Sequence, residues 1–271
     1  MNYWMIMISW IGLLACGSQA QEMQSEPVAV TTGSLEAVAV VELFTSEGCS
    51  SCPPAEAVLN QLVATLETSD QRIFPLAFHV DYWNRLGWTD RFSKADFSQR
   101  QYQYAEKFGG GRVYTPQMIV NGKKEFVGIN QRPLDAALNT SLSQPASVGI
   151  LANCQQLSSG ELQVGYGLTN HQSGQILNIA LVQQDLETEV ARGENRGRKL
   201  AHQNVVRHFQ SIPLKAETKG EVKLSLTEEE LGNCEVILYM QDQKNWEVLG
   251  SVLWIPATSP LRPPDKITFP S

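Results

Sequence analysis

Hydrophobic residues gather in two continuous runs in the first third of the chain. Residues 35–45 and 73–80 are largely apolar without alternation, which predicts two strands buried on both faces. Between them, residues 53–66 place apolar side chains at helical spacing. A strand, a helix and a second strand in this order favour a βαβ unit with a parallel pair of strands.

Shorter elements follow, beginning with an aromatic-rich segment in which residues 93–108 predict a helix. Residues 113–120 predict a strand that contains a proline. Asn121-Gly122 is a strong hairpin signal, and the returning strand is expected over residues 125–128. Residues 132–142 predict a closing helix, so the order of elements is β-α-β-(α)-β-β-α.

Beyond residue 145, apolar and polar positions alternate in short segments bounded by turn residues. This pattern predicts an antiparallel sandwich. The expected strands are 148–154, 161–168, 175–183, 221–225, 234–241 and 247–254. The basic segment 192–198 is expected to bind an anion, to face the first half of the chain, or to be a solvated loop.

The N-terminus predicts export. Residues 3–15 are apolar but too short to cross a bilayer comfortably. Leu13-Leu14-Ala15-Cys16 resembles a bacterial lipobox, whose cysteine is lipidated; the alternative is ordinary signal cleavage near Ala20. Both interpretations place the protein in the periplasm, and the first predicts a membrane contact only through lipid on Cys16.

Composition narrows the function classes. The 271 residues are 42% hydrophobic, enough for two ordinary domains. A net charge of −7 argues against a nucleic-acid partner. The 4 histidines leave little room for a multi-histidine metal centre, and we expect no metal and no cofactor. If Cys16 carries lipid or leaves with the signal peptide, the remaining cysteines are Cys49, Cys52, Cys154 and Cys234.

Cys49 and Cys52 form a Cys-x-x-C pair where the first strand passes into the first helix, the arrangement typical of a thiol–disulfide exchange site. The prolines that follow belong in the first turn of a helix, so Ser50 or Ser51 is the predicted N-cap. Free backbone N–H groups there stabilise a thiolate. We therefore expect Cys49 to be the nucleophile and Cys52 the resolving thiol.

Motifs in both halves of the chain carry a family resemblance: F-T-S-E-G-C-S-S-C-P-P at 44–54, A-F-H-V-D-Y-W at 77–83 with L-G-W at 86–88, Y-T-P-Q-M-I-V-N-G at 114–122, R-G-E-N-R-G-R at 192–198 and H-Q-N-V-V-R at 202–207. With them the chain resembles the thioredoxin superfamily, and more closely a bacterial family of predicted secreted proteins classed as a domain of unknown function. The resemblance implies an α/β fold: a thioredoxin-like fold with an α-helical insertion, followed by a smaller antiparallel β-sandwich-like domain. The expected divisions are a signal peptide (1–20), a tether (21–34), a thioredoxin-like domain (35–145), a β-rich domain (146–256) and a Pro-rich tail (257–271).

The resemblance also implies a role for Thr115-Pro116. In thioredoxin-like proteins this proline follows a cis peptide, and the backbone of the preceding residue pairs with the substrate. We expect Pro116 to belong to the catalytic site and Thr115 to bind substrate. The alternative is a trans proline that starts an edge strand.

Residues around the second strand are auxiliary candidates. Asp81 is expected either to accept a proton from Cys52 or to cap a turn, and His79 to lower the pKa of Cys49, to join a copper site, or to be a core residue. The aromatic residues Tyr82, Trp83 and Trp88 are expected to build a substrate pocket or to cover the site.

Cys154 and Cys234 sit at inward positions of two predicted strands. A structural disulfide between them is the prediction for an oxidising compartment, and two separate buried thiols are the alternative.

The leading hypothesis is an exported thiol–disulfide oxidoreductase that acts on protein thiols and disulfides. One alternative is a non-enzymatic binding or scaffold protein in which the disulfide between Cys49 and Cys52 only stabilises the fold. Another is a copper-handling protein that uses these cysteines and His79.

Overall fold

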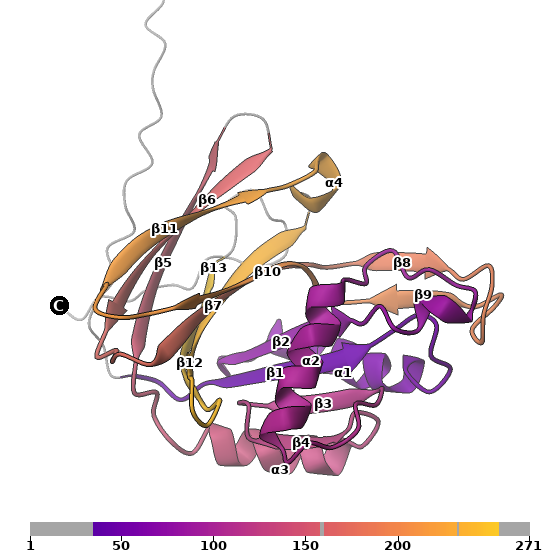
Figure 1. The fold of residues 1–271 in the computed structure, drawn as a ribbon, viewed down its shortest axis with the longest axis horizontal. Helices are drawn as coiled ribbons and strands as arrows, with labels where there is room; N and C mark the ends of the chain where they lie inside the picture. The colour runs from indigo at the N-terminus through magenta and orange to yellow at the C-terminus, as the bar shows by residue number, and fades with distance from the viewer. Residues whose placement is uncertain (1–34, 158–159, 232, 255–271) are drawn as a thin grey trace, which may run out of the picture.

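The fold is taken from a computed structural model, which describes residues 35–254 apart from 158–159 and 232 (Figure 1). The helices are α1 (Pro53–Leu66), η1 (Asn84–Leu86), α2 (Ala95–Lys107), α3 (Gln131–Ser141) and α4 (Glu228–Leu231). The strands are β1 (Ala39–Thr45), β2 (Ile73–His79), β3 (Gln117–Val120), β4 (Lys124–Val127), β5 (Gly149–Leu157), β6 (Glu161–Thr169), β7 (Gln175–Gln183), β8 (Leu186–Glu189), β9 (Lys199–His202), β10 (Val205–Pro213), β11 (Lys219–Ser225), β12 (Cys234–Asp242) and β13 (Val248–Trp254).

One mixed sheet of eight strands forms the centre of the molecule, in the order β13-β12-β7-β10-β2-β1-β3-β4. β1 and β2 run parallel, as the βαβ pattern predicts, and β3 pairs antiparallel with β1. β10 continues the sheet beyond β2, where Val205 pairs with Ala77. Strands from both halves of the chain therefore share one sheet, which crosses the predicted domain boundary after residue 145.

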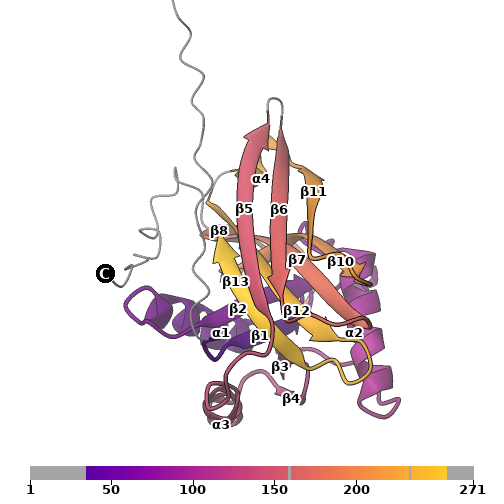
Figure 2. The same cartoon turned by 90° about the vertical axis from the view of Figure 1, so that its left-hand side faces the viewer.

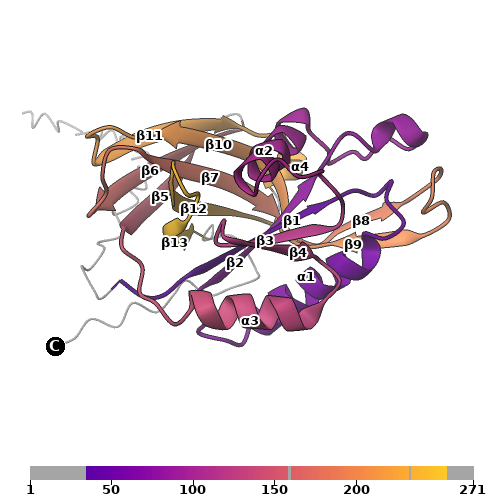
Figure 3. The same ribbon diagram turned by 60° about the horizontal axis from the view of Figure 1, so that its bottom comes forward.

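Helices cover both faces of the part of the sheet formed by β1 to β4 (Figure 3). α1 and α3 pack on one face, where Leu59 and Leu134 meet Val41 of β1. α2 packs on the other face, where Tyr104 meets Phe44. β1 is buried along its whole length, in agreement with its unbroken apolar sequence.

A buried ion pair connects α2 with the sheet. Arg100 of α2 donates to the Glu42 carboxylate of β1 at 2.6 and 2.9 Å, and it also donates to the Tyr239 hydroxyl of β12 at 2.9 Å. Burial lowers the pKa of Arg100, but the charge of Glu42 outweighs it and raises that pKa well above its usual range. The pair therefore joins elements from both halves of the chain.

The three-stranded sheet β11-β6-β5 lies against the far end of the large sheet (Figure 2). Its inward side chains, such as Val164, share a core with Leu181 of β7 and Leu238 of β12. β8 and β9 form a two-stranded arm beside α1, where the Asn60 side chain donates to the carbonyl of Ala201 at 2.9 Å.

The fold class predicted from the sequence is wrong. The structure is 42% strand and 20% helix, with a mixed eight-stranded sheet in place of a thioredoxin-like α/β fold with a helical insertion and a separate sandwich. The reason lies in β10, which the sequence did not reveal. A register shift between Val206 and His208 interrupts the alternation of this strand, and β10 is the strand that connects β2 to β7.

The predicted signal peptide, tether and Pro-rich tail, with Cys16, lie outside the described residues. Within the part of the chain that the structure describes, no helix combines the length and apolar character needed to span a bilayer.

Candidate functional site

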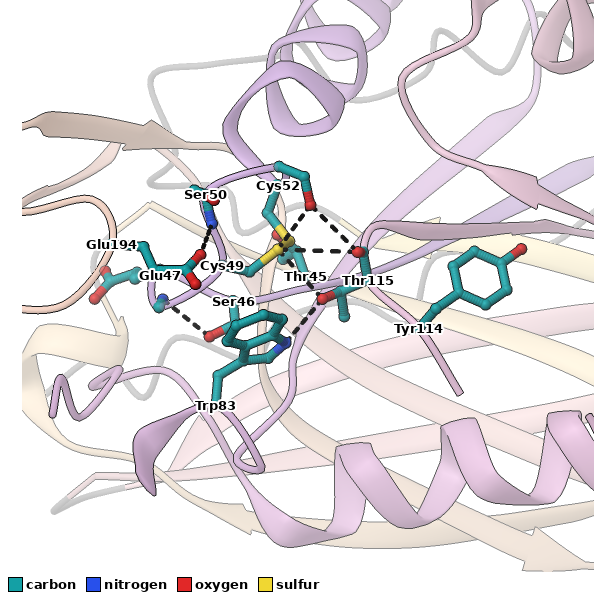
Figure 4. The surroundings of a disulfide bond; sticks show 12 residues. Thr45, Ser46, Glu47, Cys49, Ser50, Cys52, Trp83, Tyr114, Thr115 and Glu194 are labelled. Atoms are coloured by element: carbon teal, nitrogen blue, oxygen red, sulfur yellow. Dashed lines mark hydrogen bonds between the residues drawn. A yellow bond between two sulfur atoms is a disulfide. The ribbon is translucent and has the colours of Figure 1, made fainter. Parts of the chain in front are cut away.

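The Cys49–Cys52 disulfide lies between the end of β1 and the start of α1 (Figure 4). Both cysteines are 0% exposed. Ser50 and Ser51 between them are exposed. The disulfide therefore lies directly beneath a short surface turn.

The helix start differs from the prediction. α1 begins after Cys52, which occupies the N-cap position in place of Ser50 or Ser51. The two prolines that open the helix have no N–H group. The N–H groups of Ala55 and Glu56 bond to the Cys52 carbonyl at 2.9 and 3.1 Å. The first turn therefore does not offer the free N–H donors that were expected to stabilise a thiolate.

The Thr115 hydroxyl donates to the Cys49 sulfur instead, at 3.3 Å. The Ser51 hydroxyl lies 3.2 Å from the same sulfur, and it also donates to the Thr115 carbonyl at 3.4 Å. Trp83 donates its indole N–H to the Thr115 hydroxyl oxygen at 2.8 Å, which leaves the Thr115 proton for the sulfur (Figure 4). Since hydrogen bonds to a charged acceptor are stronger than neutral ones, the Thr115 hydroxyl favours a thiolate when the disulfide opens.

The Thr115-Pro116 peptide bond is cis, which confirms that prediction. The carbonyl oxygen of Thr115 lies 3.9 Å from the Cys49 sulfur. The backbone that was expected to bind substrate therefore lies beside the disulfide.

The segment between β8 and β9 holds the turn that carries the cysteines. The buried Asn195 amide donates to the carbonyls of Glu47 and Cys49, each at 2.9 Å. The Glu194 carboxylate accepts the Ser50 N–H at 2.9 Å (Figure 4). Of the interpretations of segment 192–198, the structure supports contact with the first half of the chain.

The three aromatic residues that were predicted to lie at the site contact different partners. Trp83 reaches Thr115, whereas Tyr82 donates to the Gln101 side chain at 3.0 Å. Trp88 donates its indole N–H to the Glu47 carboxylate at 2.7 Å. Burial raises the pKa of Tyr82 to about 12, so its phenol is neutral at physiological pH.

Asp81 accepts a hydrogen bond from the Ser98 hydroxyl of α2 at 2.5 Å. Its backbone N–H donates to the same hydroxyl oxygen at 3.1 Å. This geometry joins the end of β2 to α2, and the proton-transfer role toward Cys52 stays a prediction.

His79 belongs to a second, fully buried group of ionisable side chains, which we call the histidine–carboxylate cluster: Glu47, Glu56, His79, Asp90 and His202. The Nδ1 atom of His79 lies 2.7 Å from the Asp90 carboxylate. The Nδ1 atom of His202 lies 2.5 Å from the Glu56 carboxylate. Burial lowers the pKa of His202, but the charge of Glu56 and hydrogen bonds with Glu47 and Glu56 raise it to about 10.

Two carboxylates of the cluster, Glu56 and Asp90, have lowered pKa values. Burial raises the pKa of Glu56, but the charge and hydrogen bond of His202 outweigh it and lower that pKa overall. Burial likewise raises the pKa of Asp90, and His79 with the N–H groups of Glu47 and Phe92 lowers it overall.

Glu56 follows Cys52 by four positions, so both side chains leave the same face of α1. That spacing is a local signal which links the cluster to the disulfide. His202 belongs to the motif at 202–207, but that motif did not place it beside Glu56, which lies 146 residues away in the sequence.

The predicted disulfide between Cys154 and Cys234 is not formed. Both residues line the same core, and both are thiols. Burial raises the pKa of Cys234 to about 11 and that of Cys154 further. Because disulfide formation proceeds through a thiolate, two thiols held protonated in an apolar core resist oxidation.

Comparisons with known proteins give a family and a fold. A family model described as "Protein of unknown function (DUF1223)" matches residues 40–241, a span that contains the disulfide and the β8–β9 arm. The crystal structure of protein AGR_C_4864 from Agrobacterium tumefaciens is 28% identical over 81% of this chain and 95% of that chain, with a TM-score of 0.59. The structure of OgpA from Akkermansia muciniphila is 12% identical over 39% of this chain and 28% of that chain, with a TM-score of 0.22. No curated protein matches the chain.

Proposed function

The chain belongs to the DUF1223 family of proteins of unknown function, and on this premise we propose that it is an exported thiol–disulfide oxidoreductase. The observation that carries the proposal is the Thr115 hydroxyl, which donates to the Cys49 sulfur at 3.3 Å, with the Ser51 hydroxyl 3.2 Å from the same sulfur. A disulfide that only holds a fold together needs no donor to its sulfur, whereas a leaving or attacking thiolate gains from one. The proposal rests on this local chemistry; a relationship to the thioredoxin superfamily stays a hypothesis carried by the Cys-x-x-C and Thr-Pro motifs.

The exchange begins from the disulfide. A thiolate of a partner protein attacks the Cys49 sulfur, a mixed disulfide forms, and Cys52 leaves as a thiolate. The second thiolate of the partner then attacks its own sulfur in the mixed disulfide and releases the Cys49 thiolate. The partner loses two electrons and two thiol protons and gains a disulfide, and Cys49 and Cys52 gain both electrons and take up protons according to their pKa values. The same steps in reverse reduce a disulfide of the partner.

Access to Cys49 requires the covering turn to move, because both cysteines are 0% exposed. Ser50 and Ser51, which form this turn, are exposed, so a partner meets them first. The carbonyl of Thr115 lies close by, where it accepts the Ser51 hydroxyl at 3.4 Å; movement of the turn frees it to position the backbone of a partner.

The same burial favours a second candidate, a non-enzymatic binding or scaffold protein. In that case the disulfide and the Asn195 bonds to the carbonyls of Glu47 and Cys49 hold a rigid surface for a partner. This candidate predicts a disulfide that resists reduction.

A redox titration of the full chain separates the two. Cys49 and Cys52 are followed by alkylation and mass spectrometry against defined thiol–disulfide buffers. A potential of about −120 to −270 mV, with rapid alkylation of Cys49 once reduced, supports exchange. A potential below about −300 mV with unreactive sulfurs refutes the proposal and favours the scaffold. In the Cys52→Ser variant, exchange also predicts a trapped mixed disulfide between Cys49 and a partner protein.

Export and lipidation of Cys16 belong to the same proposal, since an oxidising compartment supplies the partner disulfides. Fractionation of cells that express the wild type and the Cys16→Ser variant tests both. We expect the wild type in the membrane fraction facing the periplasm and the variant detached from the membrane. Recovery of the wild type in the cytoplasm contradicts export.

A further inference from the structure

We propose that the loop between β8 and β9 (residues 190–198), which we call the arginine loop, is a docking surface for an acidic segment of the partner protein. Arg192, Arg196 and Arg198 receive the carboxylates of that segment. All three side chains are exposed, and the loop reaches the disulfide, because Asn195 donates to the Cys49 carbonyl at 2.9 Å. The inference rests on the proposed exchange reaction and adds the chemical class of its partner.

The three arginines are free to bind an anion. Within the part of the chain that the structure describes, none of their guanidinium groups forms an ion pair or a hydrogen bond. The acidic side chains of β8 face Lys199 instead: Glu187 accepts from its ammonium group at 2.6 Å, and Glu189 lies opposite Lys199 in the register of β8 and β9. Although the whole chain has a net charge of −7, the side of the disulfide turn that the loop covers is therefore rich in available positive charge.

The backbone of the arginine loop is held in place. The Val190 N–H donates to the Arg198 carbonyl at 2.9 Å and closes the loop. Asn195 is 0% exposed and anchors the middle of the loop to the disulfide turn. Gly193 has a φ of 76°, and a Cβ atom there would lie 3.2 Å from the Cβ of Trp88. The guanidinium groups therefore extend from a fixed frame, so a partner has only side chains to order when it binds.

A carboxylate already binds the disulfide turn. The Glu194 side chain, from the middle of the arginine loop, accepts the Ser50 N–H at 2.9 Å (Figure 4). Both residues are exposed, so a carboxylate of a partner can take the position of Glu194. This exchange of carboxylates releases Ser50 from the arm and removes one restraint on the turn that covers Cys49. An acidic segment therefore finds its charge partners on the loop and also loosens the cover of the disulfide.

The residue type and the position of the loop favour an acidic polypeptide. A guanidinium group binds a carboxylate through two parallel hydrogen bonds. Each exposed ion pair is weak, so three of them give a contact that a substrate can leave after exchange. Anionic headgroups of a membrane offer similar charge, but the loop adjoins a disulfide, which reacts with protein thiols and not with lipid.

Binding is measured with peptides that cannot exchange. Three fluorescent peptides share a centre without cysteine and are flanked by glutamates, by glutamines or by lysines. Fluorescence anisotropy with the oxidised full chain reports their affinities. We expect the glutamate peptide to bind about tenfold more tightly than the glutamine peptide at low salt, and the difference to disappear at high salt. Equal affinities for these two peptides at low salt overturn the proposal.

Replacement of the three arginines by glutamine locates the surface. The combined Arg192→Gln, Arg196→Gln and Arg198→Gln changes remove the charge and keep polar side chains at exposed positions, and we expect the preference for the glutamate peptide to be lost. Lys199→Gln is the matched control, because Lys199 lies on the same arm but is engaged by Glu187; we expect it to keep the preference. A triple variant that still prefers the glutamate peptide refutes the assignment.

Sedimentation with vesicles that contain phosphatidylglycerol tests the membrane alternative. If the arginines bring the wild type to these vesicles while the peptides show no charge preference, the surface binds lipid and the proposal is wrong.

Rates of exchange separate this inference from the proposed function. The same peptides with a Cys-Ser-Ser-Cys centre, and dithiothreitol as an uncharged reductant, are tested for reduction of the Cys49–Cys52 disulfide in the wild type. Faster reduction by the glutamate peptide than by the glutamine peptide supports both proposals. Equal rates for the two peptides support exchange and overturn the acidic docking surface. Failure of every dithiol to reduce the disulfide refutes the proposed function, whereas the affinities of the cysteine-free peptides still decide whether the docking surface exists.

Discussion

Replacement of Thr115 by valine isolates the hydroxyl that donates to the Cys49 sulfur at 3.3 Å. Valine keeps the shape of threonine and removes the donor. A hydrogen bond to a charged group contributes about 1.5–3 kcal/mol, and a neutral one contributes about 0.5–1.5 kcal/mol. Loss of the donor therefore costs the thiolate about 1–1.5 kcal/mol more than it costs the thiol or the disulfide.

This difference sets the expected shift in Cys49. At 1.36 kcal/mol per unit, Thr115→Val raises the pKa of Cys49 in the reduced protein by about 1 unit. At about 30 mV per 1.4 kcal/mol, it also lowers the reduction potential by about 20–30 mV where the thiolate is the populated form. The Trp83 indole loses its acceptor in every redox state, so that cost affects stability and not the shift.

The pH dependence of Cys49 alkylation by iodoacetamide measures the pKa directly, since the thiolate is the reactive form. Thr115→Ser is the matched control, because it restores the hydroxyl and returns the pKa to within a few tenths of the wild-type value. An unchanged pKa in Thr115→Val refutes the claim that this hydroxyl stabilises the thiolate. An equal shift in Thr115→Ser assigns the effect to packing instead.

Three further predictions concern the frame around the site. Arg100→Met leaves the Glu42 carboxylate buried without its partner, so the free energy of unfolding in urea falls by about 3–5 kcal/mol; a loss below about 1 kcal/mol contradicts the buried ion pair. Asn195→Ala removes two bonds to backbone carbonyls, so we expect a loss of about 1–3 kcal/mol and faster reduction of Cys49 by dithiothreitol; an unchanged reduction rate shows that this amide does not restrain the turn. Burial raises the pKa of Cys234 from 9.0 to about 11, so the folded state holds the thiol proton more tightly than the unfolded state. The stability that this proton contributes is complete below pH 9 and is lost as the pH rises toward 11. Urea unfolding between pH 9 and 11 should therefore show a smaller decline in stability for Cys234→Ala than for the wild type.

Local sequence patterns were sufficient to predict most of the helices and strands. The helix over 53–66 is confirmed at both ends, because its opening prolines and its apolar spacing are properties of the segment itself. The strand over 175–183 is confirmed in the same way. The cis peptide at Thr115-Pro116 followed from a motif and needed no long-range information.

The errors concern partners that are distant in the sequence. β10 was not predicted because its register shift breaks the alternation of apolar and polar residues that is typical of a strand. Without β10, the sequence predicts two separate folds for the two halves of the chain. The histidine–carboxylate cluster was not predicted because the contact between His202 and Glu56 depends on the packing of β9 beside α1. Periodicity gives the burial of a residue but not the identity of a neighbour more than a hundred positions away.

The β8–β9 arm brings residues from the second half of the chain to the site. Its Glu194 and Asn195 hold the turn at the disulfide, and its last residue, His202, enters the histidine–carboxylate cluster. The Cys-x-x-C pair and the Thr115 hydroxyl that donates to it come from the first half, whereas the hydrogen bonds that hold the turn come from the second. In the proposed exchange the turn must move before a partner reaches Cys49, so we expect the arm to set the resistance to exchange. The second half of the chain therefore contacts the disulfide turn of the first half directly, and we expect the rate of the proposed exchange to depend on both.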